Sequence, residues 1–345
     1  MSDKDNGSDR GQGNTRMNND VDEQDINDPE KPHQSRFRIL VCIDGSDESY
    51  RGVRYAAKMA KGEDVDIVLC YVRPVDQGLR SGGLQMDVAR GNMLEWGLEL
   101  PGITYLKKGR NLLMELGNLK DDWDEKAFHT DIAGTSLGDN KIDYTAKSGK
   151  KIVLKLKVAR DITTGILDQW ELGHYDLIIM GAAARWDKKG SNPIRGILDP
   201  AIADKIATHA PCSVLIARDL EIGHGHLVCT DGSDLANEML TKEAYIASLC
   251  DCPISLLTVV PDVESQEKGQ KIVDNASNML TELELDVVDK IVRVGEPENE
   301  IIEAGPDYSL IVVADGGKGG IERFFVGSVA QNVIQNAYNS VMIIR

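Results

Sequence analysis

The feature that most restricts the fold of this chain is an internal repeat. Six of the seven residues in its best-matching segment are identical between the two copies. The distance between matching segments falls from 187 to 133 to 127 residues along the chain, so the first copy carries the extra residues. Segments that recur in the same order predict two copies of one structural unit. The matching pairs are Val41–Asp47 with Val228–Asp234, Tyr175–Gly181 with Tyr308–Ala314, and Ser213–Arg218 with Ser340–Arg345.

Each copy alternates short apolar runs with segments of helical spacing. Ile39–Ile43 and Val65–Val72 are typical of strands buried on both faces of a parallel sheet. Between them, Tyr50, Val53 and Ala57 recur at helical spacing, which completes a βαβ unit. We therefore predict an α/β protein with two tandem open parallel five-stranded sheets and helices on both faces. This Rossmann-like arrangement has the expected strand order 3-2-1-4-5.

Composition divides the chain into three parts. Residues 1–35 are polar and acidic with almost no large apolar residue, which predicts a disordered tail. Residues 36–220 form the first predicted domain, and residues 221–345 form the second. The extra residues of the first domain fall at about 77–150, where the two copies do not correspond.

The insertion ends in a segment of alternating character. Lys155 and Lys157 alternate with apolar residues in Ile152–Val158, so one face of this strand is expected to be wet. Lysines on a strand also discourage pairing with another sheet edge. We therefore predict an edge strand here.

Charge and hydropathy exclude two classes of partner. The net charge is −17, whereas nucleic acids are bound by basic surfaces. No apolar run approaches the roughly 20 residues that span a bilayer, and the first 35 residues hold no apolar signal-peptide core. We expect a cytoplasmic protein with no nucleic-acid or membrane partner.

The cysteines do not form an obvious metal motif. Three of the six lie inside predicted buried strands, where cysteine behaves as a small apolar residue. Cys250 and Cys252 form a single C-x-C with no second pair. The nearest histidines, His224 and His226, precede a different strand. We therefore expect free thiols here rather than a metal site.

A glycine-rich stretch in the second copy is typical of phosphate binding. The predicted strand Leu310–Val313 leads into Ala314–Gly320, and Gly327 and Ser328 open a predicted helix with Ser328 as its cap. Glycines let backbone N–H groups come close to a ligand, and a helix N-terminus adds partial positive charge.

The arrangement resembles the universal stress protein family. Nucleotide-binding members of that family carry Gly-x-x-Gly, nine residues and then Gly-Ser/Thr after the fourth strand, with an Asp after the first strand. The second copy has Gly317, nine intervening residues and Gly327-Ser328, with Asp231 after its first strand. It departs from the pattern at Ala314, which stands where the first glycine belongs.

The resemblance covers about residues 36–218 and 224–345, apart from the insertion. It implies that an aspartate and its neighbour meet the adenine, an apolar residue packs on the ring, and the loop and helix hold the phosphates. In the alternative interpretation the glycines only turn a loop and Asp231 caps a helix. The residues that the resemblance assigns to the nucleotide are Thr230, Asp231, Val259, Ala314, Gly317, Gly327, Ser328 and Val329.

The first copy has lost most of this pattern. Asp44 and Val72 are present, but the loop Gly181–Pro200 lacks the second glycine and has Ile197 at the Ser/Thr position. We expect this domain to be a structural partner of the second. Single-copy relatives resemble dimers joined through their last strands, which implies an intrachain pseudo-dimer here. Further association into a homodimer stays open.

The predicted function is that of a stress-response regulator that binds ATP or AMP, with Mg²⁺ as a potential companion, and that acts on an unknown protein partner. The alternative is a nucleotide-free interaction scaffold with the insertion as its docking element. No G-x-S-x-G, H-E-x-x-H or P-loop motif is present. We therefore assign no catalytic residue and expect at most slow ATP hydrolysis.

Overall fold

The computed structural model describes most of the chain after the first 35 residues. The predictions on the N-terminal tail, on Gly317 and on the loop after Ala182 lie outside the described residues. The described ranges are 36–62, 64–75, 101–119, 122–132, 135–171, 173–182, 200–218, 224–316 and 327–345.

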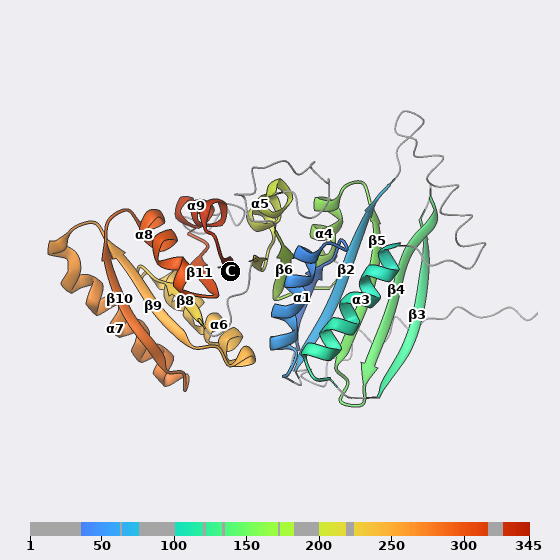
Figure 1. The fold of residues 1–345 in the computed structure, drawn as a ribbon, viewed down its shortest axis with the longest axis horizontal. Helices are drawn as coiled ribbons and strands as arrows, with labels where there is room; N and C mark the ends of the chain where they lie inside the picture. Colours follow the sequence, from blue (N-terminus) through green and yellow to red (C-terminus); the bar gives the residue numbers. More distant parts are fainter. Residues whose placement is uncertain are drawn as a thin grey trace, which may run out of the picture. The chain divides into compact units, whose positions relative to one another are not determined.

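Strands and helices alternate along both repeats, except that β3, β4 and β5 of the first repeat follow one another directly (Figure 1). The strands are β1 (Phe37–Cys42), β2 (Val65–Pro74), β3 (Trp123–Ile132), β4 (Thr135–Ala146), β5 (Lys151–Ala159), β6 (Leu177–Gly181), β7 (Ser213–Ala217), β8 (His226–Cys229), β9 (Ile254–Val260), β10 (Val287–Val294), β11 (Leu310–Ala314) and β12 (Ser340–Ile344). The α-helices are α1 (Asp47–Met59), α3 (Pro101–Leu116), α4 (Ile162–Glu171), α5 (Pro200–His209), α6 (Asp234–Cys250), α7 (Gln266–Glu282), α8 (Pro297–Ala304) and α9 (Ser328–Asn336). Two 3₁₀ turns are η3 (Val263–Ser265) and η4 (Gly305–Asp307).

The strands of the described residues form one sheet of twelve, in the order β10-β9-β8-β11-β12-β7-β6-β1-β2-β5-β4-β3. Within each repeat the five strands that correspond to one another follow the order 3-2-1-4-5 and are parallel. The predicted α/β class is confirmed. The expectation of two separate sheets needs correction, because the last strands of the two repeats join them into one.

The seam between the repeats is an antiparallel pairing of β12 with β7, which confirms that the last strands of the two copies pair. The hydrogen bonds at the seam are reciprocal. The Arg218 backbone N–H donates to Ser340 Oγ at 2.9 Å, and the Arg345 N–H donates to Ser213 Oγ at 3.2 Å. These four residues are partners in the sequence repeat, so the seam has the symmetry of a twofold dimer.

The arginine side chains extend the same symmetry. The Arg218 guanidinium donates to Asn339 O at 2.9 Å and to a carbonyl in the last turn of α9. The Arg345 guanidinium donates to Cys212 O at 3.3 Å and to a carbonyl in the last turn of α5. Each repeat therefore supplies an arginine that binds the carbonyls at the end of the other repeat's last helix, where positive charge is favourable.

The insertion adds β4 and β3 to the sheet as antiparallel strands beyond β5. Because β5 lies between β2 and β4, the prediction that it is an edge strand is wrong. The wet face implied by its lysines is covered instead by an ion pair, with Lys157 Nζ 2.8 Å from Asp139 Oδ2 of β4. Strand β3 takes the edge position.

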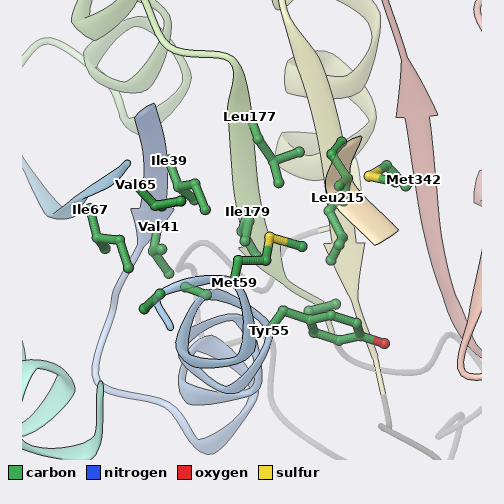
Figure 2. Close-up of a cluster of buried hydrophobic side chains, with 14 of the residues drawn as sticks. Ile39, Val41, Tyr55, Met59, Val65, Ile67, Leu177, Ile179, Leu215 and Met342 are labelled. Carbon is green, nitrogen blue, oxygen red and sulfur yellow. The ribbon is translucent and has the colours of Figure 1, made fainter. Parts of the chain in front are cut away.

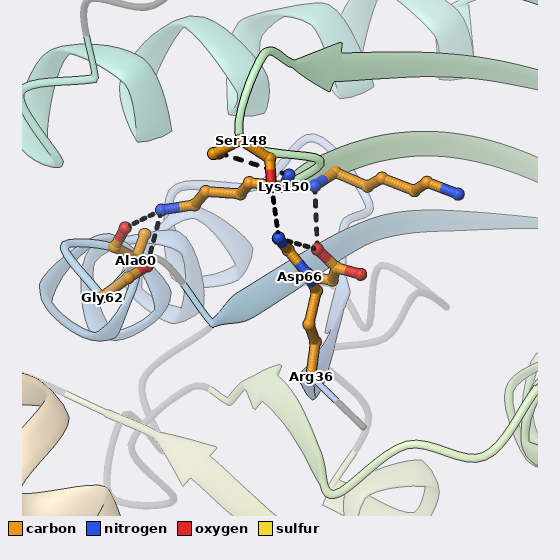
Figure 3. A network of polar contacts seen from close by, with 7 residues as sticks. Arg36, Ala60, Gly62, Asp66, Ser148 and Lys150 are labelled. Atoms are coloured by element: carbon orange, nitrogen blue, oxygen red, sulfur yellow. Dashed lines mark hydrogen bonds and ion pairs between the residues drawn. The ribbon is translucent and has the colours of Figure 1, made fainter. Parts of the chain in front are cut away.

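The turn between β4 and β5 also fastens the insertion to α1 (Figure 3). The buried Lys150 ammonium donates to Ala60 O and to Gly62 O, the latter at 2.9 Å. The Arg36 guanidinium donates to Ser148 O at 2.7 Å and lies 3.5 Å from Asp66 Oδ1. Lys150 thus binds carbonyls at the C-terminal end of α1, where a cation complements the helix dipole.

The core lies on both faces of the sheet. Helices α1, α3, α6 and α7 pack on one face, and α4, α5, α8 and α9 pack on the other. The core beneath α1, α3, α6 and α7 continues across the seam, because Leu215 of β7 and Met342 of β12 lie in the same buried cluster (Figure 2). Within the described residues, the helices are too short or too polar to cross a membrane.

Candidate functional site

A cavity of about 280 Å³ lies at the carboxyl ends of the strands of the second repeat. Its position is where ligands bind in open parallel sheets, since neighbouring strands there lead to opposite faces. The walls come from β8, β9 and β11, from α6, α8 and α9, and from the loop after β11. The lining residues are Cys229, Thr230, Asp231, Ala236, Leu257, Val259, Pro297, Ile301, Val313, Ala314, Gly316, Gly327, Ser328, Val329 and Ala330.

The turn after β8 presents an exposed carboxylate to this cavity. Asp231 Oδ1 accepts from Ser233 N–H at 2.9 Å, and Gly232 between them has φ +74°, which favours glycine. Ser233 is the N-cap of α6 and accepts from Ala236 N–H at 3.2 Å. Because Ser233 caps the helix, the alternative in which Asp231 is the cap is wrong. Asp231 is exposed at the strand end.

The two ends of the glycine-rich loop are in close backbone contact. A Cβ at Gly327 would lie 3.0 Å from Gly316 Cα, and one at Gly316 would lie 3.5 Å from Gly327 Cα. The approach at Gly327 is tighter than most contacts of a real Cβ, which favours glycine there, whereas the distance at Gly316 is an ordinary van der Waals contact. Ala314, just before it, is half-buried at the end of β11, and its methyl group forms part of the cavity wall.

The N-cap of helix α9 lies one residue earlier in the chain than the sequence predicted. The N-cap is Gly327, and Ser328 is the first helical residue. Within the described chain, no side chain accepts a hydrogen bond at this cap. The predicted capping role of Ser328 is therefore wrong. The exposed Ser328 hydroxyl and the first N–H groups of α9 face the cavity as donors for an anion.

Asp315, directly after β11, places an acid beside the expected phosphate position. Its Oδ2 lies 2.8 Å from Arg345 Nε, and both side chains are largely buried. The Asp315 N–H also donates to Ile344 O at 3.3 Å. The negative charge is thus neutralised by the seam arginine.

Seven of the eight residues that the sequence assigned to a nucleotide line the cavity, and Gly317 lies outside the described residues. Eight further lining residues were not among those assigned, and three of these, Ala236, Pro297 and Ile301, come from helices α6 and α8. Pro297 and Ile301 belong to α8, which follows the third strand of the repeat. The Gly295-Glu296-Pro297 turn is a signal that this helix starts at the same edge of the sheet.

The corresponding region of the first repeat is built differently. A Cβ at Gly181, the partner of Ala314, would lie 2.1 Å from Glu48 O in the first turn of α1. A Cβ at Gly45 would lie 2.8 Å from the ring of Tyr105, which belongs to α3 of the insertion. Asp44 is present, and its Oδ1 accepts from Ser46 N–H at 3.0 Å. Backbone and an aromatic ring therefore crowd the ends of β6 and β1.

The fold and the cavity define an α/β protein with a ligand site at the strand ends of its second repeat. The model of the universal stress protein family matches residues 36–95 and 226–345, which is just over half of the chain. The chain belongs to the universal stress protein family. A universal stress protein of Methanocaldococcus jannaschii is 30% identical over 138 residues, which cover 34% of this chain and 80% of that protein.

Solved structures agree on the fold. A universal stress protein from Archaeoglobus fulgidus superposes with a TM-score of 0.53 at 14% identity, and the match covers 89% of this chain and 96% of that one. Another structure from Archaeoglobus fulgidus is of a universal stress protein in complex with dAMP. It is 25% identical and matches 36% of this chain and 100% of its own, with a TM-score of 0.31.

Proposed function

We propose that the second repeat binds an adenine nucleotide, ATP or AMP, and that the bound nucleotide regulates association with a protein partner in a stress response. The observation that carries the proposal is the cavity of about 280 Å³, whose lining includes Thr230, Asp231, Val259, Ala314 and Ser328. Its volume is near the lower end of the usual range for small-molecule pockets, about 300 Å³.

The chemistry of the walls suits the parts of a nucleotide. The exposed Asp231 carboxylate is an acceptor for the exocyclic amino group of adenine, and Val259 offers an apolar surface to the ring. At the opposite side, the Ser328 hydroxyl and the N-terminus of α9 are donors for phosphate oxygens. Neutralisation of Asp315 by Arg345 removes the charge that would otherwise repel those phosphates.

The test is isothermal titration calorimetry of the purified full chain with ATP and with AMP, each with and without Mg²⁺. We expect about one site per chain. Protein that already holds nucleotide would instead release about one adenine nucleotide per chain on denaturation. A chain that contains no nucleotide and gives no binding heat with either ligand would contradict the proposal and favour the nucleotide-free scaffold.

A further inference from the structure

A cluster of metal-ligating side chains lies at the other end of the second repeat, at the start of β8. It consists of His226, the first residue of β8, of Cys250, the last residue of α6, and of Cys252 in the turn to β9. The ligand atoms of these three side chains all lie within 4.8 Å of one another. Cys250 Sγ is 3.9 Å from His226 Nε2.

The backbone explains why the cysteines meet a histidine from a different strand. β8 and β9 are parallel neighbours, with His226 paired to Ile254 in register. The His226 N–H donates to Pro253 O at 2.8 Å. Gly225 has φ +66°, and a Cβ there would lie 2.4 Å from Pro253 O. The C-x-C turn is therefore held directly against the start of β8.

The second ring nitrogen of His226 is already oriented. His226 Nδ1 lies 2.5 Å from Glu243 Oε1, and both side chains are almost completely buried. This contact directs Nε2 toward the two sulfur atoms. Histidines that ligate metals commonly donate their other N–H to a carboxylate, which fixes the tautomer and the ring orientation.

We propose that His226 Nε2 and the thiolates of Cys250 and Cys252 bind one Zn²⁺ ion. Two thiolates and an imidazole form a donor set that suits Zn²⁺, with Zn–S distances of about 2.3 Å and a Zn–N distance of about 2.0 Å. The fourth ligand is a water molecule from the adjoining cavity of about 110 Å³, which Tyr55 and Lys58 of α1 also line. The site is separate from the proposed nucleotide cavity, which lies at the opposite ends of the strands.

The redox state of the cysteines controls this site. The two sulfur atoms are joined as a disulfide in the structure, contrary to the expectation of free thiols, and in that form they are not available to a metal. A small dithiol reductant supplies two electrons, breaks the S–S bond and becomes a disulfide itself, which leaves two protein thiols. Zn²⁺ then displaces their two protons. The disulfide form of the site therefore binds no metal, and the dithiol form binds Zn²⁺.

The four remaining cysteines supply an internal control. Cys42, Cys70 and Cys212 are buried, and burial raises the pKa of Cys70 and of Cys212 to about 12. Burial also raises the pKa of Cys229. These groups remain protonated thiols near neutral pH, so that metal binding by the native protein reports on the C-x-C pair.

The experiment measures metal uptake by the full chain. The protein is reduced with excess dithiol, freed of it by anaerobic gel filtration, mixed with Zn²⁺ and analysed by mass spectrometry of the metal. We expect about one Zn²⁺ per chain in the wild type and in Cys212→Ser, and none in the Cys250→Ser/Cys252→Ser double variant. Glu243→Gln should weaken affinity by about tenfold to a hundredfold. Co²⁺ in place of Zn²⁺ should give the absorption of a tetrahedral thiolate complex, and this absorption should persist in Glu243→Gln.

Circular dichroism checks that the variants are folded. The wild type oxidised to the disulfide is a second test that needs no variant, and it should take up no metal. The proposal is overturned if the folded, reduced wild type binds no stoichiometric Zn²⁺. Uptake that persists in the folded double variant or in the oxidised wild type would overturn it as well.

Discussion

The two repeats are alike at the seam that joins them and unlike at the carboxyl ends of their first and fourth strands. At the seam, Arg218 and Arg345 bind equivalent carbonyls of the opposite repeat. At the strand ends, Ala314 borders an open cavity, whereas Gly181 is pressed against the backbone of α1. The two repeats therefore share their architecture at the seam, and among the described residues they differ in how closely the ends of β6 and β11 are packed.

The helix between the second and third strands of each repeat accounts for part of this difference. In the second repeat, Gly232 faces the aliphatic side chain of Ile272 from α7. In the first repeat, α3 takes the corresponding place between the second and third strands, and Tyr105 covers Gly45. The same helix position therefore carries a larger side chain over the strand end, and the Tyr50 hydroxyl donates to Tyr105 O at 3.2 Å.

The largest effect is expected from exchanging the residues at the ends of β6 and β11. Gly181→Ala would place a methyl group 2.1 Å from Glu48 O, a backbone atom that moves only if α1 moves. We expect the free energy of unfolding to fall by about 3 kcal/mol or more. Ala314→Gly should change it by at most about 1 kcal/mol and should leave nucleotide binding intact. Urea unfolding of both variants measures this, and equal stabilities would contradict the contrast.

The next effect tests the likeness of the repeats at the seam. Arg218→Met and Arg345→Met each remove charge-assisted hydrogen bonds to backbone carbonyls, which should lower the free energy of unfolding by about 2 kcal/mol. The loss at Arg345 should be the larger, because Asp315, only 14% exposed, also loses its ion pair. Lys271→Met is the matched control, since its pair with Glu267 is exposed and is worth at most about 0.5 kcal/mol. The measurement is denaturant titration. A loss of unfolding free energy in Arg218→Met no larger than that in Lys271→Met would contradict the likeness of the repeats at the seam.

A smaller effect separates the two aspartates after the first strands. Asp231→Ala removes the carboxylate proposed to accept from adenine, which should weaken nucleotide binding about tenfold, or about 1.4 kcal/mol. Asp44→Ala should leave binding unchanged. Calorimetry on the two variants decides between them, and an equal loss in both would mean that the nucleotide does not belong to the second repeat alone.

The smallest effect concerns the caps of α4 and α8, which correspond to each other. Asp161 accepts from Thr164 N–H at 2.9 Å and from the Thr164 hydroxyl at 2.8 Å, whereas Glu296, the N-cap of α8, makes no such side-chain bond within the described residues. Asp161→Ala should cost about 1 kcal/mol and Glu296→Ala almost nothing. These differences are measured by urea unfolding at neutral pH.

The cost at Asp161 should also depend on pH. The two bonds from Thr164 lower the pKa of the Asp161 carboxyl. A lowered folded-state pKa contributes stability above the unfolded value, about 3.9, and that contribution is lost as the pH falls through the folded value. The difference between wild type and Asp161→Ala should therefore shrink below about pH 4. A difference that stays constant into strong acid would exclude the carboxylate as its source.

Much of the fold was predictable because the sequence contains two copies of the same structural unit. The strand order was assumed from the usual arrangement of open parallel sheets, and the pairing of Ser213–Ile216 with Ser340–Ile344 was implied by the resemblance to single-copy dimers. The position of β5 was not predictable in the same way. Alternating lysines indicate which face of a strand is polar, but they do not indicate whether another strand lies alongside. In the structure β4 lies beside β5, and its Asp139 pairs with Lys157.

The candidate cavity was largely predictable and its details were not. Residues at the carboxyl ends of parallel strands gather at one edge, so Thr230, Val259 and Ala314 were expected to meet. The cap of α9 shifted to Gly327 because backbone dihedral angles, which the sequence does not state, decide where a helix begins. The sequence analysis set a metal site at Cys250 and Cys252 aside because His226 precedes a different strand, and the pairing of β8 with β9 is what brings the three side chains together.

The seam between β7 and β12 has a consequence for how this protein responds to mutation. In a dimer of two identical chains, every substitution appears twice, once on each side of the axis. Here each side of the seam is encoded separately, so that a substitution changes one half and leaves the other as it was. One half can therefore accept a change that would be intolerable in duplicate, and the pairing survives dilution because both strands belong to the same molecule.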